Sequence, residues 1–460
     1  MKVLQINSVC GIRSTGRIAT DFAEEYIKNG DECFIAYGRE AVPPKYEKIS
    51  YRIGTNFSVK FNAIMSRVFD NEGFNAKRQT RKFLKWADNY DPDVLWLHNL
   101  HGYYLNVEML FDWIKSRPNM QVKWLLHDCW AFTGHCAYFT MANCHKWREC
   151  CLDCPQKKQY PSSIFKDNSK NNFIRKKKCF SEINNMTLVT PSHWLADLVR
   201  QSFLNEYPIE VRHNTIDTEV FKPTPSDFRK RYGLEGKKII LGVASTWDER
   251  KGLNDFIELS DMLDDTYAIV LVGLSDEQIK CLPSNVVSIS KTDNVKKLVE
   301  IYSAADVFVN PSKEETFGLT TLEALSCGTD AIVYKDTACE EVVKKYGGVA
   351  VAQSAQSIKD ELTQKFGGGK PIIVCFTATN NARELAAIYS SADVFLNLTY
   401  EDNYPTVNLE SQACGTPCIT YNTGGSVESV PRNNIIQKGD LKALVRRIKE
   451  IVDSKSIFSE

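Results

Sequence analysis

The 460-residue sequence has no excess of charge of either sign, because 57 Lys and Arg residues are matched by 57 Asp and Glu residues. A neutral chain has no overall attraction for nucleic acid, so we expect no nucleic-acid partner. No apolar run approaches the roughly 18 residues that cross a bilayer. The start, MKVLQINSV, lacks the apolar h-region and small-residue cleavage site of a signal peptide. We therefore expect a cytoplasmic protein.

The sequence also lacks the cysteine pattern of a disulfide-stapled fold. Its 15 cysteines are odd in number and scattered, which argues against a complete disulfide framework. In the cytoplasm we expect these thiols to be mostly reduced. Hydrophobic residues make up 43% of the chain, as in globular proteins with full cores, and the length suits two or three domains.

Short apolar strands alternate with amphipathic helical stretches from the first residue onward. Residues 2–9, 32–38, 93–99, 122–128 and 188–192 read as strands. This alternation predicts a parallel sheet covered by helices on both faces. Ligands bind beyond the carboxyl ends of such strands, and the polar residues found there are His98, Asn99, His127, Asp128 and Ser192.

A second α/β series begins near residue 237. Strands are expected at 237–245, 267–273, 286–290, 305–312 and 330–336. The polar, proline-bearing stretch 210–236 is a plausible connection between the two series. The α/β layout predicts two Rossmann-like domains facing each other across a cleft, with boundaries at 1–218 and 219–365.

The end of the sequence repeats part of the second series. Residues 293–329 and 380–416 align without a gap at an offset of 87, and 16 of the 37 positions are identical. The second copy has no counterpart of residues 237–272. Residues 366–460 are therefore expected to form a partial repeat of the C-terminal domain.

Several motifs in order carry a resemblance to a known family. They are INSVCGIRSTGRI, LHNLHG, LHDCWAFTGHC, VTPSHWLADLV, NTIDTEVFKP, ERKGL and EETFGLTTLEALSCGT. The chain resembles the retaining GT-B glycosyltransferases of family 4, in particular bacterial enzymes of capsular, colanic-acid-like or other exopolysaccharide synthesis. The resemblance covers about residues 1–360 and again 373–450. It implies a nucleotide-sugar donor, a glycan or polyprenyl-linked acceptor, and no cofactor required for catalysis.

The resemblance assigns Glu315 and Glu323 to the donor. In the family, the first Glu approaches the donor sugar and the second hydrogen-bonds the nucleotide ribose. Backbone N–H groups of Gly318, Leu319 and Thr320 would lie near the diphosphate at a helix N-terminus. The alternative is an acidic surface loop followed by one Glu in the first turn of a helix.

A basic turn follows the first strand of the second series. Fixed cations at a diphosphate leaving group stabilise the transition state as negative charge develops. Lys251 matches the family's Lys-Gly pair, and Arg250 precedes it, but Ser245 stands where the family has an Arg. The alternative is a solvated basic turn.

The resemblance places His127 facing the transferred sugar from the N-terminal domain. In the front-face displacement attributed to this family, the leaving phosphate takes the acceptor proton, so His127 need not be a base. The alternative is a histidine of the core. Asp128, His98 and Asn99 are weaker acceptor-side candidates, and Gly11 and Gly16 flank a loop that can approach a ligand closely or form a simple tight turn.

Four cysteines, Cys136, Cys144, Cys151 and Cys154, form a C-x7-C-x6-C-x2-C pattern. A reduced group of four can hold a tetrahedral structural zinc ion. The alternative is buried or incidental thiols, because only the last pair has the spacing of a standard zinc ribbon.

Residues 157–178 carry eight basic residues and one acidic residue, with Phe165, Phe173 and Ile174 among them. This composition suits contact with an anionic membrane surface or a lipid diphosphate, and equally suits a solvated helix. A peripheral position at the inner face of the membrane is thus one expectation.

Three functions remain open from the sequence. The first is an active sugar transferase, favoured by Lys251, Glu315 and Glu323 together. The second is a non-catalytic binding or scaffold protein with the same fold, suggested by Ser245 and the repeated tail. A sugar-nucleotide epimerase is the third, although its acid/base pattern is not evident.

Overall fold

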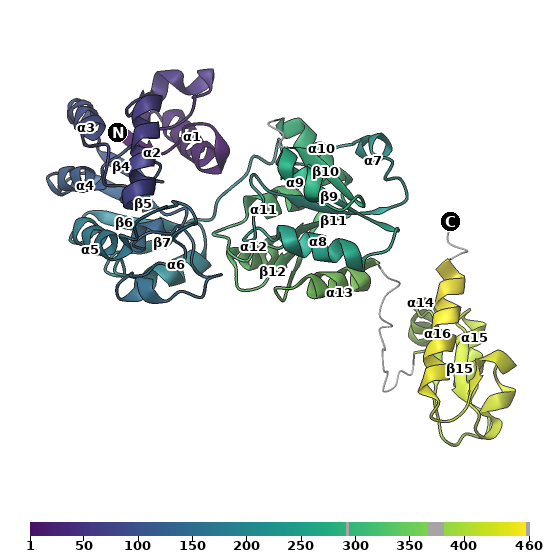
Figure 1. Cartoon of the computed structure of the whole chain (residues 1–460). Coiled ribbons are helices and arrows are strands. Elements are labelled where there is room, and N and C mark those ends of the chain that lie inside the picture. Colours follow the sequence, from purple (N-terminus) through teal and green to yellow (C-terminus); the bar gives the residue numbers. More distant parts are fainter. Residues whose placement is uncertain (291–293, 367–380, 457–460) are drawn as a thin grey trace. The chain divides into compact units, whose positions relative to one another are not determined.

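The computed structural model describes residues 1–290, 294–366 and 381–456, with side chains up to residue 452 (Figure 1). The chain divides into two compact units, Met1–Lys359 and Asp360–Glu460. The first unit contains two parallel sheets, each covered by helices. The prediction of two Rossmann-like α/β folds in series is confirmed.

The N-terminal sheet has seven parallel strands in the order β3-β2-β1-β4-β5-β6-β7. The strands are β1 (Lys2–Asn7), β2 (Glu32–Tyr37), β3 (Ser50–Arg52), β4 (Val94–Leu97), β5 (Gln121–Leu125), β6 (Met186–Thr190) and β7 (Ile209–Val211). The helices are α1 (Arg13–Lys28), α2 (Asn56–Phe69), α3 (Lys77–Tyr90), α4 (Val107–Lys115), α5 (Ser169–Phe180) and α6 (His193–Arg200). Three 3-10 helices, η1 (Pro44–Ile49), η2 (Trp130–Phe132) and η3 (Lys146–Arg148), complete this part.

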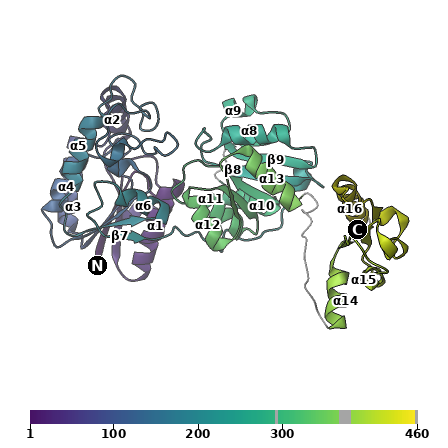
Figure 2. The ribbon, with the colours of Figure 1, turned by 90° about the horizontal axis from the view of Figure 1, so that it is seen from below.

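Side chains of β1 alternate between two hydrophobic clusters because successive strand residues point to opposite faces. Leu4 and Ile6 pack in the cluster that includes α3, α4 and α5, whereas Val3 packs with α1. Figures 1 and 2 show α3, α4 and α5 side by side along one side of this sheet. Gln5 is fully buried on the Val3 face, so its amide needs partners inside the protein.

The second sheet has six parallel strands in the order β10-β9-β8-β11-β12-β13. The strands are β8 (Lys238–Val243), β9 (Tyr267–Leu274), β10 (Val286–Ser290), β11 (Val307–Asn310), β12 (Asp330–Tyr334) and β13 (Val349–Val351). The helices are α7 (Phe228–Arg231), α8 (Leu253–Met262), α9 (Asp276–Cys281), α10 (Val295–Ala304), α11 (Leu319–Ser326), α12 (Ala338–Tyr346) and α13 (Ala355–Phe366).

Residues from the N-terminal part and from the C-terminal part of the first unit together cap the N-terminus of helix α6. Helix α6 begins at His193, and the Ser192 hydroxyl accepts from the N–H of Leu195 at 3.1 Å. The Glu341 carboxylate, on α12, accepts from the N–H groups of His193 at 2.8 Å and Trp194 at 2.6 Å. A carboxylate at a helix N-terminus is favourable because it meets otherwise unpaired N–H groups and the positive end of the helix dipole.

The second unit has a three-stranded parallel sheet in the order β14-β15-β16. Its elements are α14 (Ala382–Ser391), β14 (Phe395–Asn397), α15 (Thr406–Ala413), β15 (Cys418–Tyr421), η4 (Gly424–Glu428), η5 (Arg432–Asn434), β16 (Ile435–Ile436) and α16 (Leu441–Ser456). Phe395 pairs with Cys418, as Phe308 pairs with Ala331 between β11 and β12. Each residue of the first pair lies 87 positions after its counterpart in the second pair, which is the offset of the sequence repeat.

Predicted and observed elements differ mainly at the short edge strands. Sequence reading missed β3, β7 and β13, each only three residues long. The predicted connection 210–236 begins inside β7 and contains the short helix α7. Residues 293, 373–379 and 380, where the predicted repeat and the resemblance begin, lie outside the described residues. In the described part of the chain, no helix combines the length and apolarity needed to cross a bilayer.

Candidate donor and acceptor site

Two loops meet at the carboxyl ends of β8 and β11. The 311–318 loop follows β11, and the 244–252 loop follows β8. Gly252 has φ +74°, and a Cβ there would lie 2.4 Å from the carbonyl oxygen of Pro311. Gly318 has φ +91°, and a Cβ there would lie 2.5 Å from Cys339 Sγ. Both positions favour glycine, because the backbone has a positive φ and a Cβ would collide with the Pro311 backbone or with the Cys339 side chain.

The structure brings Lys251 and Glu315 together in an ion pair at the meeting of these loops. Arg250 lies beside them: its Nη1 donates to the carbonyl of Glu314 at 3.0 Å, and its guanidinium stacks 4.2 Å from the ring of Tyr138. Burial alone would raise the pKa of Glu315, but Lys251 and then Arg250 outweigh it and hold the pKa below its usual value. Glu315 is therefore ionised at neutral pH.

Helix α11 presents unpaired donors beside this ion pair. The backbone N–H groups of Gly318, Leu319 and Thr320 have no hydrogen-bond partner among the described residues. Such groups at a helix N-terminus bind anions well. Leu319 itself packs against the hydrophobic cluster of β1, β2 and α1.

Glu323 lies on the same helix but is buried. Its Oε2 accepts from Tyr302 Oη at 2.9 Å. Burial raises the pKa of Glu323, with Tyr302 and the positive charge of Arg17 acting in the opposite direction. Sequence reasoning missed Arg17, which brings a cation from α1 toward this carboxylate. Ser245, where the family has an Arg, is exposed.

His127 lies at the end of β5 and pairs with His98 at the end of β4. The distance from His98 Nδ1 to His127 Nε2 is 3.1 Å, and from His98 Nε2 to Gln5 Oε1 it is 3.0 Å. Burial lowers the pKa of His127 to about 4, with Asp128 raising it and His101 lowering it. The same cause, followed by His127, holds the pKa of His98 well below its usual value.

Asp128 belongs to a second buried network. Its Oδ2 is 2.8 Å from His101 Nε2, and His101 Nδ1 is 3.0 Å from Tyr160 Oη. Burial would raise the pKa of Asp128, but His101 outweighs it and the pKa is lowered. The sequence did not identify His101 and Tyr160 as site residues, although His101 lies in the same LHNLHG motif as His98.

Hydrogen bonds join the 311–318 loop to the loop that carries His127. Thr316 Oγ1 donates to the carbonyl of His127 at 2.9 Å. Glu314 Oε1 accepts from Thr140 Oγ1 at 2.6 Å and from the N–H of Met141 at 2.9 Å. The predicted donor residues and the predicted sugar-facing histidine therefore belong to one connected set of contacts.

The glycine loop after β1 forms a tight turn. Gly11 has φ +70°, and its N–H donates to the carbonyl of Gly16 at 3.1 Å. Asn7, at the end of β1, links this turn to Asn99: the Asn7 side chain donates to the carbonyl of Thr15 at 3.0 Å, and its Oδ1 accepts from the N–H of Asn99 at 3.3 Å. The glycine loop and Asn99, both predicted to lie on the acceptor side, thus adjoin the end of β1.

Cys136, Cys144, Cys151 and Cys154 line one small cavity of about 10 Å³. The thiol of Cys136 is hydrogen-bonded to Cys154, which lowers the pKa of Cys154 to about 7. Within the ranges that the structure describes, no group of three or more His, Cys, Asp or Glu residues is arranged to hold a metal ion. The four cysteines thus share a cavity, but within the described residues the structure gives the zinc prediction no support.

The basic segment 157–178 is divided between the surface and the core. Phe165 and Ile174 are exposed, as a membrane contact requires. Phe173 and Lys176 are buried, so their predicted membrane contact is wrong. Lys176 Nζ donates to the carbonyls of Trp130 at 2.7 Å and Thr133 at 3.0 Å, and burial lowers its pKa to about 7.

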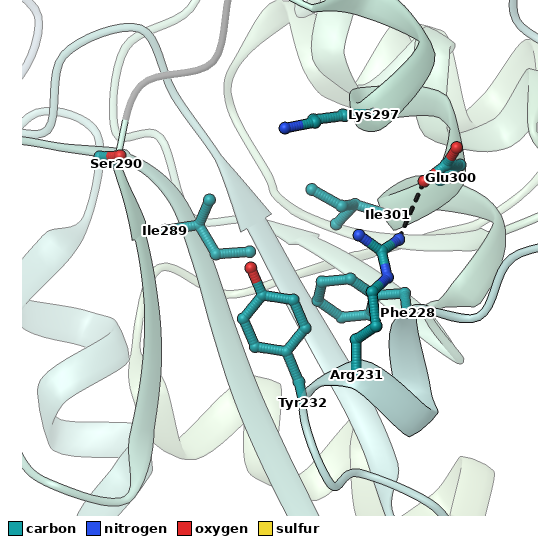
Figure 3. Close-up of a pocket in the computed structure, with 8 residues that line it drawn as sticks. All are labelled: Phe228, Arg231, Tyr232, Ile289, Ser290, Lys297, Glu300 and Ile301. Atoms are coloured by element: carbon teal, nitrogen blue, oxygen red, sulfur yellow. Dashed lines mark hydrogen bonds and ion pairs between the residues drawn. The ribbon is translucent and has the colours of Figure 1, made fainter.

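A separate pocket of about 280 Å³ lies between α7, β10 and α10 (Figure 3). Its charged groups include Lys297 and the pair formed by Arg231 and Glu300, whose Nη2 and Oε2 atoms are 3.0 Å apart. The pocket shares no residue with the loops after β8 and β11. Within it, Arg231 is already paired with Glu300.

Comparison with known proteins identifies a family and a fold. The sequence profile of the family described as "Glycosyl transferases group 1" matches residues 226–366 and 369–458, together half of the chain. WcaC of Escherichia coli (strain K12), a glycosyl transferase attributed to colanic acid biosynthesis, is 25% identical over 390 residues. That alignment covers 80% of this chain and 93% of WcaC.

Solved structures with the same fold are more distant in sequence. Sucrose-phosphate synthase from Thermosynechococcus elongatus aligns with a TM-score of 0.58 and 15% identity, covering 80% of this chain and 90% of that one. Anabaena HepE in complex with UDP-glucose aligns with a TM-score of 0.53 and 14% identity, covering 80% and 90%. At these identities the likeness concerns the fold.

Proposed function

Because the chain belongs to the group 1 glycosyl transferases, we propose that it transfers a sugar from a nucleotide-sugar donor to a glycan or polyprenyl-linked acceptor in cell-surface polysaccharide synthesis, with retention. The observation that carries the proposal is the Lys251–Glu315 pair beside the unpaired N–H groups of Gly318, Leu319 and Thr320. A nucleoside diphosphate needs such cations and oriented donors. The similarity to WcaC supports the polysaccharide assignment, and the fold of HepE, which binds UDP-glucose, supports the donor class.

The charges suggest how the residues divide the work. Lys251, Arg250 and the α11 N–H groups would stabilise the diphosphate as the bond from the anomeric carbon to its oxygen breaks. The acceptor hydroxyl attacks the face of the sugar from which the diphosphate leaves, and it gives its proton to the leaving phosphate oxygen. Glu315, already ionised, would hold the donor sugar rather than act as an acid. Glu323 would bind the ribose.

The direct test is incubation with UDP-, GDP- and ADP-sugars and a lipid-linked acceptor, following release of nucleoside diphosphate. We expect release that depends on one donor and on the acceptor. Tight binding without release would favour the scaffold alternative, and a new sugar nucleotide without release would favour an epimerase. Among the alternatives, the partly buried Lys251–Glu315 pair favours the transferase.

We further propose three domains, at 1–218, 219–365 and 366–460, with the last a partial repeat of the second. Matching hydrogen bonds support the repeat: Thr329 Oγ1 donates to the Tyr302 carbonyl, and Thr416 Oγ1 donates to the Tyr389 carbonyl. The family profile also matches both segments. Asp402 and Glu410 stand 87 residues after Glu315 and Glu323. Without a counterpart of Lys251, the tail lacks a complete diphosphate site.

We place the protein in the cytoplasm, at the inner face of the membrane, and assign the membrane contact mainly to α2. Phe57, Phe61 and Ile64 form an i, i+4, i+7 stripe on this helix and are 79%, 53% and 59% exposed. The charged residues of α2 are Lys60 and Arg67, both basic. The exposed Ile164 and Phe165 adjoin its end, where the Ile164 N–H donates to the Arg67 carbonyl at 2.7 Å. An apolar stripe with basic neighbours suits an anionic bilayer surface.

Vesicle flotation tests this contact. We expect binding to vesicles containing phosphatidylglycerol that weakens as salt rises, because surface charge is screened. The Phe57→Ser/Ile64→Ser variant should bind at least about tenfold more weakly, since each apolar side chain adds roughly 1–2 kcal/mol of burial. Ile27→Ser on α1, also exposed, is the matched control. Equal binding of both variants, or equal binding to neutral and anionic vesicles, would reject the assignment.

A further inference from the structure

The amide of Gln5 has a fixed orientation inside the N-terminal sheet. Its Nε2 donates to the carbonyl of Ala19 at 2.8 Å and lies 3.4 Å from Cys33 Sγ. A carbonyl oxygen only accepts hydrogen bonds, so the amide nitrogen must face Ala19. The amide oxygen therefore faces His98 Nε2, at 3.0 Å.

This orientation determines the tautomer of His98. Because Gln5 Oε1 can only accept, His98 Nε2 must carry the proton and donate. In a neutral imidazole the other nitrogen is then an acceptor. His98 Nδ1 thus presents a lone pair to His127 Nε2, 3.1 Å away.

The same reasoning determines the tautomer of His127. Its Nε2 must donate to His98 Nδ1, so Nδ1 of His127 carries the lone pair. In the described part of the chain, that Nδ1 has no hydrogen-bond partner. The Thr316 bond to the His127 carbonyl holds this residue beside the 311–318 loop.

The surroundings keep both imidazoles uncharged. The titratable groups that face His127 are His98, His101 and Asp128. Burial is the main cause that lowers the pKa of His127 to about 4. Asp128 acts in the opposite direction, but it is already bonded to His101. The hydrogen-bonded chain from Gln5 through His98 to His127, called the relay below, therefore contains neutral rings at neutral pH.

We propose that Gln5 and His98 are positioning residues that hold His127 as the Nε2–H tautomer, so that Nδ1 accepts a hydrogen bond from a hydroxyl group of the transferred sugar. This inference rests on the proposed transferase function. Sugar transfer passes through an oxocarbenium-like transition state. A neutral ring with its lone pair toward the sugar favours the developing positive charge, whereas an imidazolium or an N–H facing the sugar opposes it.

Three substitutions of His98 separate positioning from packing. An Asn Oδ1 occupies nearly the place of a His Nδ1, so His98→Asn keeps an acceptor for His127. His98→Leu removes it, and His98→Asp replaces it with a charge. The matched control is Cys33→Ala, which changes a neighbour of Gln5 outside the relay.

We expect kcat of His98→Leu to fall about tenfold, through the loss of one hydrogen bond that orients the residue in contact with the sugar. His98→Asn should stay within about threefold of wild type. In His98→Asp the carboxylate should raise the pKa of His127. The acid limb of its pH–kcat profile should then move to higher pH by at least about one unit, whereas Cys33→Ala should match wild type throughout.

Equal losses in His98→Asn and His98→Leu, with an unmoved acid limb in His98→Asp, would overturn the relay while active wild-type enzyme upholds the transferase function. If wild type transfers no sugar, the proposed function fails, and 15N NMR of selectively labelled histidines still tests the relay. We expect His127 as a single Nε2–H tautomer in wild type and a mixture in His98→Leu. A mixture in wild type would overturn it.

Discussion

Replacing Lys251 with Met removes a charge at the meeting of the loops after β8 and β11 while keeping most of the side chain's length. Lys251 is mostly buried, with 21% of its side chain exposed, and pairs with Glu315. At an effective dielectric constant of about 20, two unit charges about 4 Å apart interact with about 4 kcal/mol. If the leaving diphosphate gains about half a charge in the transition state, the loss is about 2 kcal/mol, or roughly 30-fold in kcat.

The pH dependence of Lys251→Met gives a second expectation, and its direction follows from the charges. After burial, Lys251 is the largest influence on Glu315 and the first that lowers its pKa. Without Lys251 the pKa of Glu315 should rise, and ionised Glu315 is lost as pH falls through that value. The variant should therefore lose activity at a higher pH than wild type on the acid side.

Release of nucleoside diphosphate from saturating donor, measured from pH 5 to pH 8, checks both expectations. Lys313→Met is the matched control, because Lys313 lies on the adjoining loop, is 26% exposed and pairs with Asp255 at 3.4 Å. It should stay within about threefold of wild type. Near-normal turnover of folded Lys251→Met, or an equal loss in Lys313→Met, would refute the placement of the diphosphate beside Lys251.

Two other expectations concern the ribose and the tail. Glu323→Gln should raise KM for the donor about tenfold with a smaller change in kcat. The reason is that a charged hydrogen bond to the ribose would act equally in the ground state and the transition state. An unchanged KM in steady-state kinetics would contradict this role. A chain that stops after Phe366 retains all of α13 and should bind the nucleotide with the affinity of the full chain in calorimetry, whereas loss of binding in a folded truncation would place the site in the tail.

The sequence could group the proposed donor residues because their spacing is local. Glu315 and Glu323 are eight positions apart, and the loop before α11 holds the first while the helix holds the second. Lys251 and Glu315 meet because both follow neighbouring parallel strands, β8 and β11. Strand ends in a parallel sheet share one edge, so this meeting follows from the fold class.

The relay and the second buried network could not be read in the same way. Gln5 and His98 are 93 positions apart, and His101 and Tyr160 are 59 apart. No periodicity links such residues, and only the strand register and the path of the long loop bring them together. Composition also failed for Lys176, because a count of charges does not tell which side of α5 faces the core.

The shared cap of α6 bears on how this enzyme could be recombined with its relatives. Glu341 lies 148 positions beyond His193, yet it accepts the first two N–H groups of the helix. A chimera that joins this N-terminal half to a C-terminal half without that carboxylate would leave these N–H groups without a protein acceptor. A chimera that exchanges the C-terminal half to change the donor specificity should therefore have Glu341 at this position of the new half. The contact with the first turn of α6 is then retained.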